Sequence, residues 1–212
     1  QIYKKKYIVK KIPSKAINSH IKNIFFHTLF GIFFTQTDKL MVINFFNEQS
    51  SINYIYCSMY FSPLLVFGLQ YNNAFKPLLF KNIKNRIVTL KLISNYILST
   101  LLVSVLYYFS IEFYLNFVIK TKTFNFYEYS LQICVLFSIL NVYNPFGAIH
   151  IYFRNEKFLS VLTFIGTLLT VITFLFTILN DGLSFIIPAF IIIQLMYVLV
   201  VGYFAIKNLK MV

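Results

Sequence analysis

Residues 158–179 read FLSVLTFIGTLLTVITFLFTIL, an unbroken apolar run without a charged side chain. About 20 consecutive apolar residues cross the hydrocarbon core of a bilayer as an α-helix. A second run of this kind, residues 183–206, follows after the short polar joint at Asn180 and Asp181. These two runs predict adjacent transmembrane helices.

The rest of the chain has the same character. Hydrophobic residues make up 58% of the sequence and charged residues only 12%, against about 25% charged in an average soluble domain. The solvent for most of this chain is therefore expected to be lipid. Six stretches reach spanning length: Ile24–Phe46, Tyr54–Phe75, Ile87–Phe109, Phe126–Phe153, Phe158–Leu179 and Leu183–Ile206. They are far longer than the strands of a transmembrane barrel, so we predict an all-α integral membrane protein with six transmembrane helices.

The positions of Lys and Arg predict the orientation. Sixteen of the 19 basic residues precede the first span or follow the second, fourth or sixth span. Because basic loops stay on the cytoplasmic side, both termini are expected there, in a cell inner membrane. The predicted parts are a basic cytoplasmic segment (1–22), a transmembrane lobe (23–207) and a cytoplasmic tail (208–212). The opening is basic and lacks the apolar core of a signal peptide. Since it begins with Gln1, we expect the chain to continue a longer protein.

Several function classes are disfavoured. The net charge of +13 lies in short clusters between apolar runs rather than on one folded face, so nucleic acid is not an expected partner. Cys57 and Cys134 fall inside spans and are expected to be small core residues; no metal-ligand spacing or cofactor motif is visible. The longest segment predicted outside, Ser110–Phe124, leaves no room for a catalytic domain. We therefore expect a protein that is not an enzyme and that acts within the membrane.

The first span carries two adjacent ionisable residues, Asp38 and Lys39. Charged groups at membrane depth are costly and default to functional hypotheses. At helical spacing they share a face with Thr28, Gly31 and Thr35, which is expected to look inward. Two interpretations remain open: the two charges neutralise each other at a helix contact, or they line a water-filled cavity.

Other polar residues suggest further contacts. The candidates are Lys91 with Asn95 in the third span, Asn141 with Asn144 in the fourth, Asn72 with Asn73 at the end of the second, and Arg154 after the fourth. Each has an ordinary alternative: snorkelling for the lysine, interhelical hydrogen bonding or an interfacial position for the amides, and a lipid headgroup for the arginine. Pro63, Pro145 and Pro188 are expected to break their helices, and broken helices often line cavities.

One long segment resembles a known family. Residues 35–81, TQTDKLMVINFFNEQSSINYIYCSMYFSPLLVFGLQYNNAFKPLLFK, are similar to the start of the second half of Wzx-type polysaccharide flippases. The T-D-[KR]-L-M segment of that family is matched by Asp38-Lys39-Leu40-Met41, and its alanine and proline before a basic loop by Ala74 and Pro77. The turn at residues 47–53 lacks the family's usual glycine. The resemblance extends over residues 21–207.

The resemblance implies the multidrug/oligosaccharidyl-lipid/polysaccharide exporter superfamily, whose members have two similar lobes. This chain would be the second lobe, the other half of the protein being absent. The implied activity is translocation of a polyprenyl-diphosphate-linked oligosaccharide by alternating access, for O-antigen or capsule assembly, with membrane lipid around it. Expected diphosphate contacts are Lys39, Lys91 and Arg154. Expected sugar contacts are Asn72, Asn73, Asn95, Asn141 and Asn144, and Asp38 is the candidate for ion coupling.

Three alternatives stay open. A drug or cation exporter of the same superfamily would be expected to have an acidic cavity, whereas these spans hold one Asp and two Lys residues. A membrane enzyme such as a polymerase would need a substantial periplasmic loop. The chain could also be half of a transporter that does not function alone.

Overall fold

The computed structural model describes residues 14–46, 48–119, 129–180 and 183–210, and these residues form helices. The elements are α1 (Ser14–Phe45), α2 (Glu48–Asn82), α3 (Arg86–Tyr114), the π-helical turn η1 (Leu115–Ile119), α4 (Ser130–Tyr152), α5 (Glu156–Asn180) and α6 (Leu183–Asn208). The described residues contain no strand, so the prediction of an all-α protein is confirmed for them.

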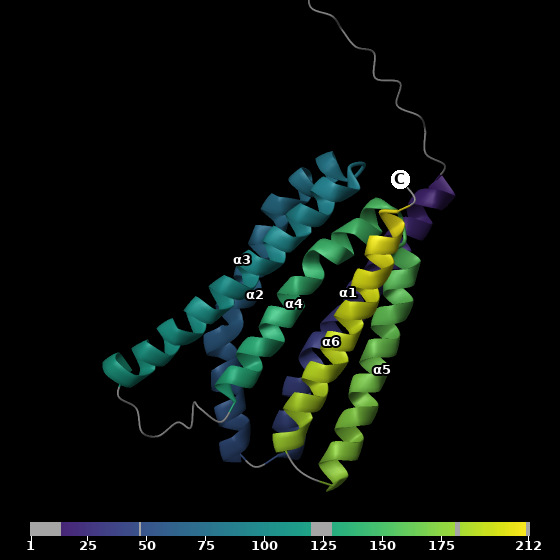
Figure 1. The fold of residues 1–212 in the computed structure, drawn as a ribbon. Helices are drawn as coiled ribbons and strands as arrows, with labels where there is room; N and C mark the ends of the chain where they lie inside the picture. The colour runs from purple at the N-terminus through teal and green to yellow at the C-terminus, as the bar shows by residue number, and fades with distance from the viewer. Residues whose placement is uncertain (1–13, 47, 120–128, 181–182, 211–212) are drawn as a thin grey trace, which may run out of the picture.

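The helices form an elongated bundle in which successive helices run in opposite directions (Figure 1). Helix α1 packs mainly on α5, and α5 also contacts α6. On the other side, α4 packs against α2, α3 and α6. Helix α4 therefore joins the α1–α5–α6 group to the α2–α3 pair.

The close contact of α1 with α5 follows from small residues on α5. The Ser160 hydroxyl donates to the Asn23 carbonyl of α1 at 2.6 Å, and the Thr167 hydroxyl donates to the Phe30 carbonyl at 3.2 Å. Between them lies Gly166, where an added Cβ would stand 3.0 Å from the Phe34 ring. Small residues let membrane helices approach closely, and hydroxyl groups then reach across the contact.

Five described helices, α2 to α6, are long and apolar enough to cross a membrane. Helix α1 has the length, with 32 residues, but is not among these five. Its apolar run is interrupted by Gln36, Asp38 and Lys39. The sequence therefore predicted six helices correctly, whereas only five of them have the composition of a lipid-exposed span.

Two predicted boundaries were wrong, both at the end of the bundle opposite the C-terminus. Helix α2 begins at Glu48, so the joint before it is shorter than the predicted residues 47–53. Helix α3 and η1 continue to Ile119, into the segment Ser110–Phe124 that was predicted as a loop. The predicted start of the fourth span, Phe126, lies outside the described residues; α4 begins at Ser130.

The prediction that proline breaks the helices was also wrong. Helix α2 continues through Pro63 and Pro77, α4 through Pro145 and α6 through Pro188. Proline cannot donate to the carbonyl four residues earlier, but neighbouring hydroxyls can replace that bond in a membrane helix. At Pro63 this carbonyl is that of Met59, and it accepts a hydrogen bond from the Ser62 hydroxyl at 2.8 Å.

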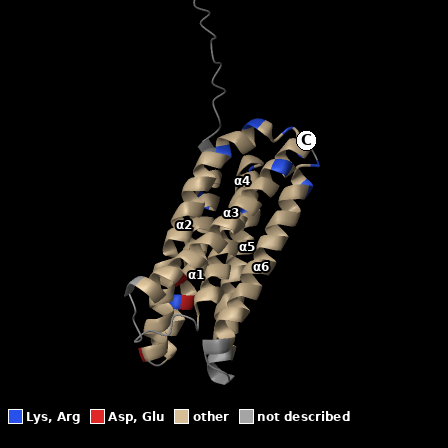
Figure 2. Ribbon diagram, turned by 60° about the vertical axis from the view of Figure 1, so that its left-hand side comes forward, with Lys and Arg blue, Asp and Glu red and all other residues tan. Residues whose placement is uncertain are grey.

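The basic residues gather at the end of the bundle that carries the C-terminus (Figure 2). The described Lys and Arg residues other than Lys39 lie in the first turns of α1, around the α2–α3 and α4–α5 turns, or at the end of α6. Across this end, among the described residues, His20 Nδ1 of α1 lies 2.9 Å from Glu156 Oε1 at the start of α5. The bundle is thus polarised along its axis, as the sequence predicted.

Candidate functional site

The most deeply buried acid among the described residues is Asp38 of α1, which is 2% exposed. It lies seven residues before the end of α1, about 10 Å from that end at 1.5 Å per residue. One carboxylate oxygen accepts a hydrogen bond from the hydroxyl of Tyr54 on α2. The Tyr54 ring packs edge-on against Tyr129, directly before α4. The carboxylate therefore sits where α1, α2 and the start of α4 meet.

This cluster has polar capacity that its neighbours do not use. The other carboxylate oxygen, Asp38 Oδ1, is buried without a hydrogen-bond partner among the described residues. Buried polar groups in folded proteins are nearly always paired, so such exceptions call for an explanation. An unpartnered carboxylate oxygen can take up a proton or accept a hydrogen bond from a water molecule.

Lys39 is directed to a different set of partners. Its ammonium group donates to Gln36 Oε1 at 2.9 Å and lies 5.9 Å from the centre of the Phe137 ring of α4. The structure, which describes both charged side chains, therefore pairs Lys39 with Gln36 rather than with Asp38. The two charged side chains therefore form no direct ion pair, and both interpretations left open by the sequence stay predictions.

The predicted polar face of α1 is buried against other helices at Asp38 and uncovered at Thr28 and Gly31. Asp38 is buried, but Thr28 is exposed, and an added Cβ at Gly31 would meet nothing within 4 Å. Thr35 lies between them, and its hydroxyl donates to the Gly31 carbonyl at 2.9 Å. A polar helix face that is open at the depth of the lipid chains is expensive unless water or protein covers it.

The amides predicted on the fourth span belong to a separate cluster, at the contact of α4 with α2. Asn141 is buried and donates to the Leu64 carbonyl at 2.8 Å, while Asn144 donates to the Gly68 carbonyl at 3.4 Å. Tyr96 of α3 donates to the same Gly68 carbonyl at 3.3 Å. A Cβ at Gly68 would lie 1.8 Å from Asn141 Oδ1, so glycine is required for this approach. These bonds favour the interhelical interpretation of the two asparagines.

The remaining predicted contacts are spread along the bundle. Lys91 and Asn95 are exposed on α3, and Asn73 is exposed on α2. Asn72 is buried, and its Oδ1 has no hydrogen-bond partner within the described part of the chain. Arg154 is exposed in the α4–α5 turn, where its φ of 58° places it in the left-handed region. The cations are therefore split between the basic end, with Lys91 and Arg154, and the opposite half, with Lys39.

The sequence analysis missed a polar junction of four helices. His27 Nδ1 of α1 lies 2.9 Å from the Thr163 hydroxyl of α5, and His27 Nε2 lies 3.1 Å from the Tyr143 hydroxyl of α4. Tyr197 of α6 completes the junction through a 2.8 Å contact with Thr163. These residues lie in four different helices, so no local spacing marks them as a group.

Two expectations about thiols and metals can be compared with the structure. Cys57 and Cys134 are buried thiols in separate helices, so the prediction of small core residues is confirmed. Within the described residues, no three His, Cys, Asp or Glu side chains are grouped in a way that could hold a metal ion.

The described residues therefore include a buried acidic cluster around Asp38, an amide cluster between α4 and α2, a polar junction around His27 and a basic end. A scan of protein-family models and searches of curated proteins and of solved structures found no match to this chain.

Proposed function

We propose that the protein is one lobe of a membrane transporter that moves a polyprenyl-diphosphate-linked oligosaccharide across the cell inner membrane by alternating access. In this proposal α1 is a sixth crossing, both termini are cytoplasmic, and a second lobe completes the transport path. The proposal rests on the flippase-like segment at residues 35–81 and on the geometry of α1.

The observation that carries the proposal is the contrast between α1 and its five neighbours. Helix α1 lies in the bundle alongside helices that are long and apolar enough to span a membrane, yet it carries Gln36, Asp38 and Lys39 within its last ten residues. A static structural helix gains nothing from a buried carboxylate with one unpartnered oxygen. A transport helix does, because ionisable residues facing a water-filled path can exchange protons or bind passing ions.

Alternating access assigns the two ends different roles. The exposed cations of the basic end, Lys91 and Arg154, would meet the diphosphate on the cytoplasmic side, since charge-assisted bonds to phosphate are roughly twice as strong as neutral ones. Lys39 would meet it nearer the opposite side. Asp38 would couple the conformational change to a proton or cation through its unpartnered oxygen.

This proposal retains fewer candidate sugar-binding residues than the sequence suggested. Asn72, Asn73 and Asn95 remain candidates, because no described hydrogen bond of their side chains commits them to another helix. Asn141 and Asn144 donate hydrogen bonds from their side-chain amides to α2 carbonyls, so their contribution is expected to be structural.

A deletion strain tests the function directly. Cells that lack the gene should lose surface polysaccharide and accumulate lipid-linked oligosaccharide on the cytoplasmic side, and the full-length gene should restore export. Normal surface polysaccharide in the deletion strain, with no accumulated intermediate, would contradict the proposal.

A further inference from the structure

Four polar side chains close a hydrogen-bonded ring where α1, α4, α5 and α6 meet; they are His27, Tyr143, Thr163 and Tyr197. Three sides of the ring are the contacts given above: His27 Nδ1 with Thr163, His27 Nε2 with Tyr143, and Thr163 with Tyr197. The fourth side joins the hydroxyls of Tyr143 and Tyr197, whose ring centroids are 5.4 Å apart. This group, here called the His27 junction, therefore links four helices through side chains alone.

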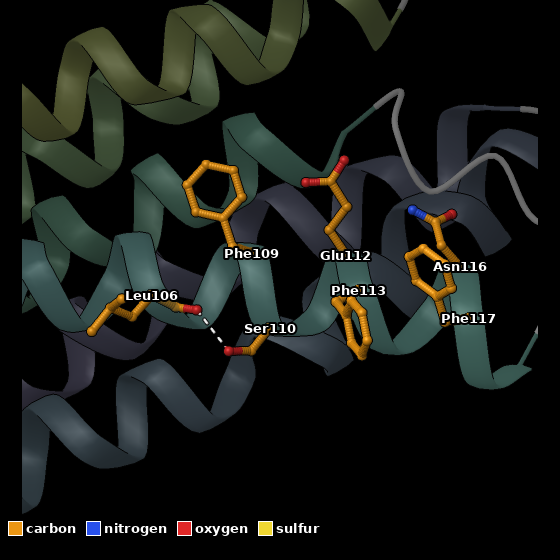
Figure 3. Close-up of a pocket in the computed structure, with 7 residues that line it drawn as sticks. All are labelled: Leu106, Phe109, Ser110, Glu112, Phe113, Asn116 and Phe117. Atoms are coloured by element: carbon orange, nitrogen blue, oxygen red, sulfur yellow. Dashed lines mark hydrogen bonds between the residues drawn. The ribbon is translucent and has the colours of Figure 1, made fainter.

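Hydroxyls elsewhere in the bundle are often bonded to their own helix. Figure 3 shows one at the end of α3, where Ser110 donates to the Leu106 carbonyl at 2.8 Å. Such a bond satisfies the hydroxyl without joining two helices. In the His27 junction the bonds of His27 and of both tyrosines pass from one helix to another, so the direction of each bond depends on the direction of the next.

The Thr163 hydroxyl fixes these directions. It donates its single hydrogen to the Leu159 carbonyl at 2.7 Å, so it accepts from His27 Nδ1 and from the Tyr197 hydroxyl. In a neutral His27 the proton is therefore on Nδ1, and Nε2 accepts a hydrogen bond from the Tyr143 hydroxyl. The hydrogen-bond pattern thus assigns one tautomer to the neutral imidazole.

A neutral His27 leaves the junction one hydrogen short. Together with the bond to the Leu159 carbonyl there are five hydrogen-bond positions, but each of the four side chains supplies only one hydrogen. The position left without a hydrogen is the one between Tyr143 and Tyr197. A second proton on His27, at Nε2, would donate to the Tyr143 oxygen and release the Tyr143 hydrogen for the Tyr197 oxygen. All five positions are filled in that state.

The contact of α1 with α5 leads from the basic end to this junction. His20 and His27 are seven residues apart on α1, and so are Glu156 and Thr163 on α5. The His20–Glu156 contact and the His27–Thr163 contact are therefore successive levels of one seam, about 10 Å apart at 1.5 Å per residue. The side chain of His20 is 41% exposed, so the outer level of the seam is open to solvent.

Titratable side chains reach α1 from each helix packed against it. Those around His27 are Tyr143 and His150 on α4, Glu156 on α5 and Tyr197 on α6, whereas Tyr54 on α2 reaches α1 at Asp38. Burial and a charged His150 oppose a positive charge on His27. The additional hydrogen bond within the junction and the carboxylate of Glu156 favour that charge.

We propose that His27 is a proton-binding site: a proton entering past His20 and Glu156 binds Nε2, turns the Tyr143 hydroxyl towards Tyr197 and so adds a hydrogen bond between α4 and α6. The protonated junction then joins these two helices by one more bond than the neutral junction. The inference goes beyond the proposed function, because it involves neither Asp38 nor a carried lipid. It is also measured without transport, so the two proposals can fail separately.

The test is a pH titration of the purified full-length protein in lipid nanodiscs, with isotope-labelled histidine and tyrosine followed by NMR. The signals of His27 are identified by their loss in His27→Gln, and those of Tyr143 by their loss in Tyr143→Phe. Tyr197→Phe removes the oxygen that the charged junction needs and keeps the aromatic ring. Tyr203→Phe is the matched control, because Tyr203 is on the same helix but 66% exposed.

In alkaline conditions His27 should carry a proton on Nδ1 alone, and it should gain the second proton, on Nε2, within about pH 5–8. The signals of Tyr143 and Tyr197 should shift with the same midpoint, because their hydrogen bond forms together with the charge. In Tyr197→Phe the midpoint should fall by about one pH unit, since the Tyr143 hydrogen then has no acceptor. Tyr203→Phe should titrate as the wild type does.

Three results would overturn the proposal. If His27 stays neutral down to about pH 5, it is only a structural member of the junction. If it titrates while the two tyrosine signals stay constant, the bond between α4 and α6 does not form. An unchanged midpoint in Tyr197→Phe would lead to the same conclusion, and if that variant does not fold, the tyrosine signals of the wild type decide.

Discussion

Two of the buried polar clusters among the described residues differ in how completely their hydrogen bonds are satisfied. In the amide cluster, Asn141, Asn144 and Tyr96 donate to α2 carbonyls. In the acidic cluster, Asp38 receives one bond from Tyr54 and keeps a second oxygen unpartnered among the described residues. The first arrangement is complete and holds helices together. The second retains the capacity to bind something that the chain itself does not supply.

The difference bears on how polar residues in a membrane helix are interpreted. Asparagine and aspartate are both expensive in lipid, and both were plausible site residues in the sequence. A polar side chain whose hydrogen bonds are all made to neighbouring helices favours a structural role, whereas one with an unpartnered atom favours a binding site. The predictions below test this distinction.

The largest expected effect is in a topology experiment, because a reporter fused to a loop is either active or inactive. The side of the membrane on which each loop lies then places the two clusters relative to the membrane. A reporter fused after Gln49 should be periplasmic if α1 is the proposed sixth crossing, and a fusion after Lys84 should be cytoplasmic. Fusions after Asp181 and Lys157 should repeat these two results. A cytoplasmic signal after Gln49 or Asp181 would remove the six-crossing arrangement and with it the outward position of Asp38.

Removal of positive charge should abolish export. Lys39→Ala or Lys91→Ala in the full-length protein should eliminate surface polysaccharide, whereas Asn95→Ala should only reduce it, because a neutral hydrogen bond contributes about 1 kcal/mol net. Membrane protein level is measured alongside by immunoblot. The variants Lys39→Gln and Lys91→Gln separate charge from packing: normal insertion with full export would exclude these two lysines from the mechanism.

A methyl group at the closed cluster should destabilise the bundle. In Gly68→Ala the new Cβ would fall 1.8 Å from Asn141 Oδ1, so the asparagine must leave its place and lose its bond to the Leu64 carbonyl. Overpacking of this kind costs about 1–3 kcal/mol, measurable as a lower midpoint of thermal unfolding in detergent. Gly31→Ala is the control, since nothing lies within 4 Å of that position.

The double variant sharpens this test. If the clash with Asn141 is the cause, Gly68→Ala/Asn141→Ala should be no less stable than Asn141→Ala alone. Additive losses in the double variant would show that Gly68 matters for another reason.

The smallest effect is expected from Asn141→Ala. It removes one interhelical hydrogen bond, and such bonds in membrane proteins contribute about 0.6 kcal/mol on average and up to about 1.7 kcal/mol. Thermal unfolding should show a small decrease while export is retained. Complete loss of export in a stable Asn141→Ala protein would place this residue in the transport path and break the distinction between the two clusters.

The helices could be predicted from the sequence because their signal is local. Runs such as residues 158–179 exceed spanning length without a charge, and the basic residues between runs give the polarity of the bundle. The helix boundaries could not be predicted in this way, because helices α2 and α3 continue beyond their apolar runs into polar sequence. The effect of Pro63 depends on the Ser62 hydroxyl, whose rotamer the sequence does not specify.

The site could be predicted only in part, for a related reason. Asp38 is conspicuous by its charge in an apolar span, but its partner Tyr54 is one of 16 tyrosines and nothing near it in the sequence marks it. The junction around His27 likewise joins residues up to 136 positions apart. Such pairings depend on how the helices pack, and a chain of apolar helices carries little information about that packing outside its small residues.

The most direct test of the central claim is the transport rate of an Asp38→Asn variant. The substitution keeps the shape of the side chain and an acceptor for Tyr54, so the fold should be preserved, but it removes the exchangeable charge. The full-length protein is reconstituted into liposomes with a fluorescent undecaprenyl-diphosphate-linked oligosaccharide, and translocation is followed by quenching from outside. The account predicts rapid translocation by the wild type and none above the protein-free background by Asp38→Asn. Translocation by Asp38→Asn at the wild-type rate would contradict it.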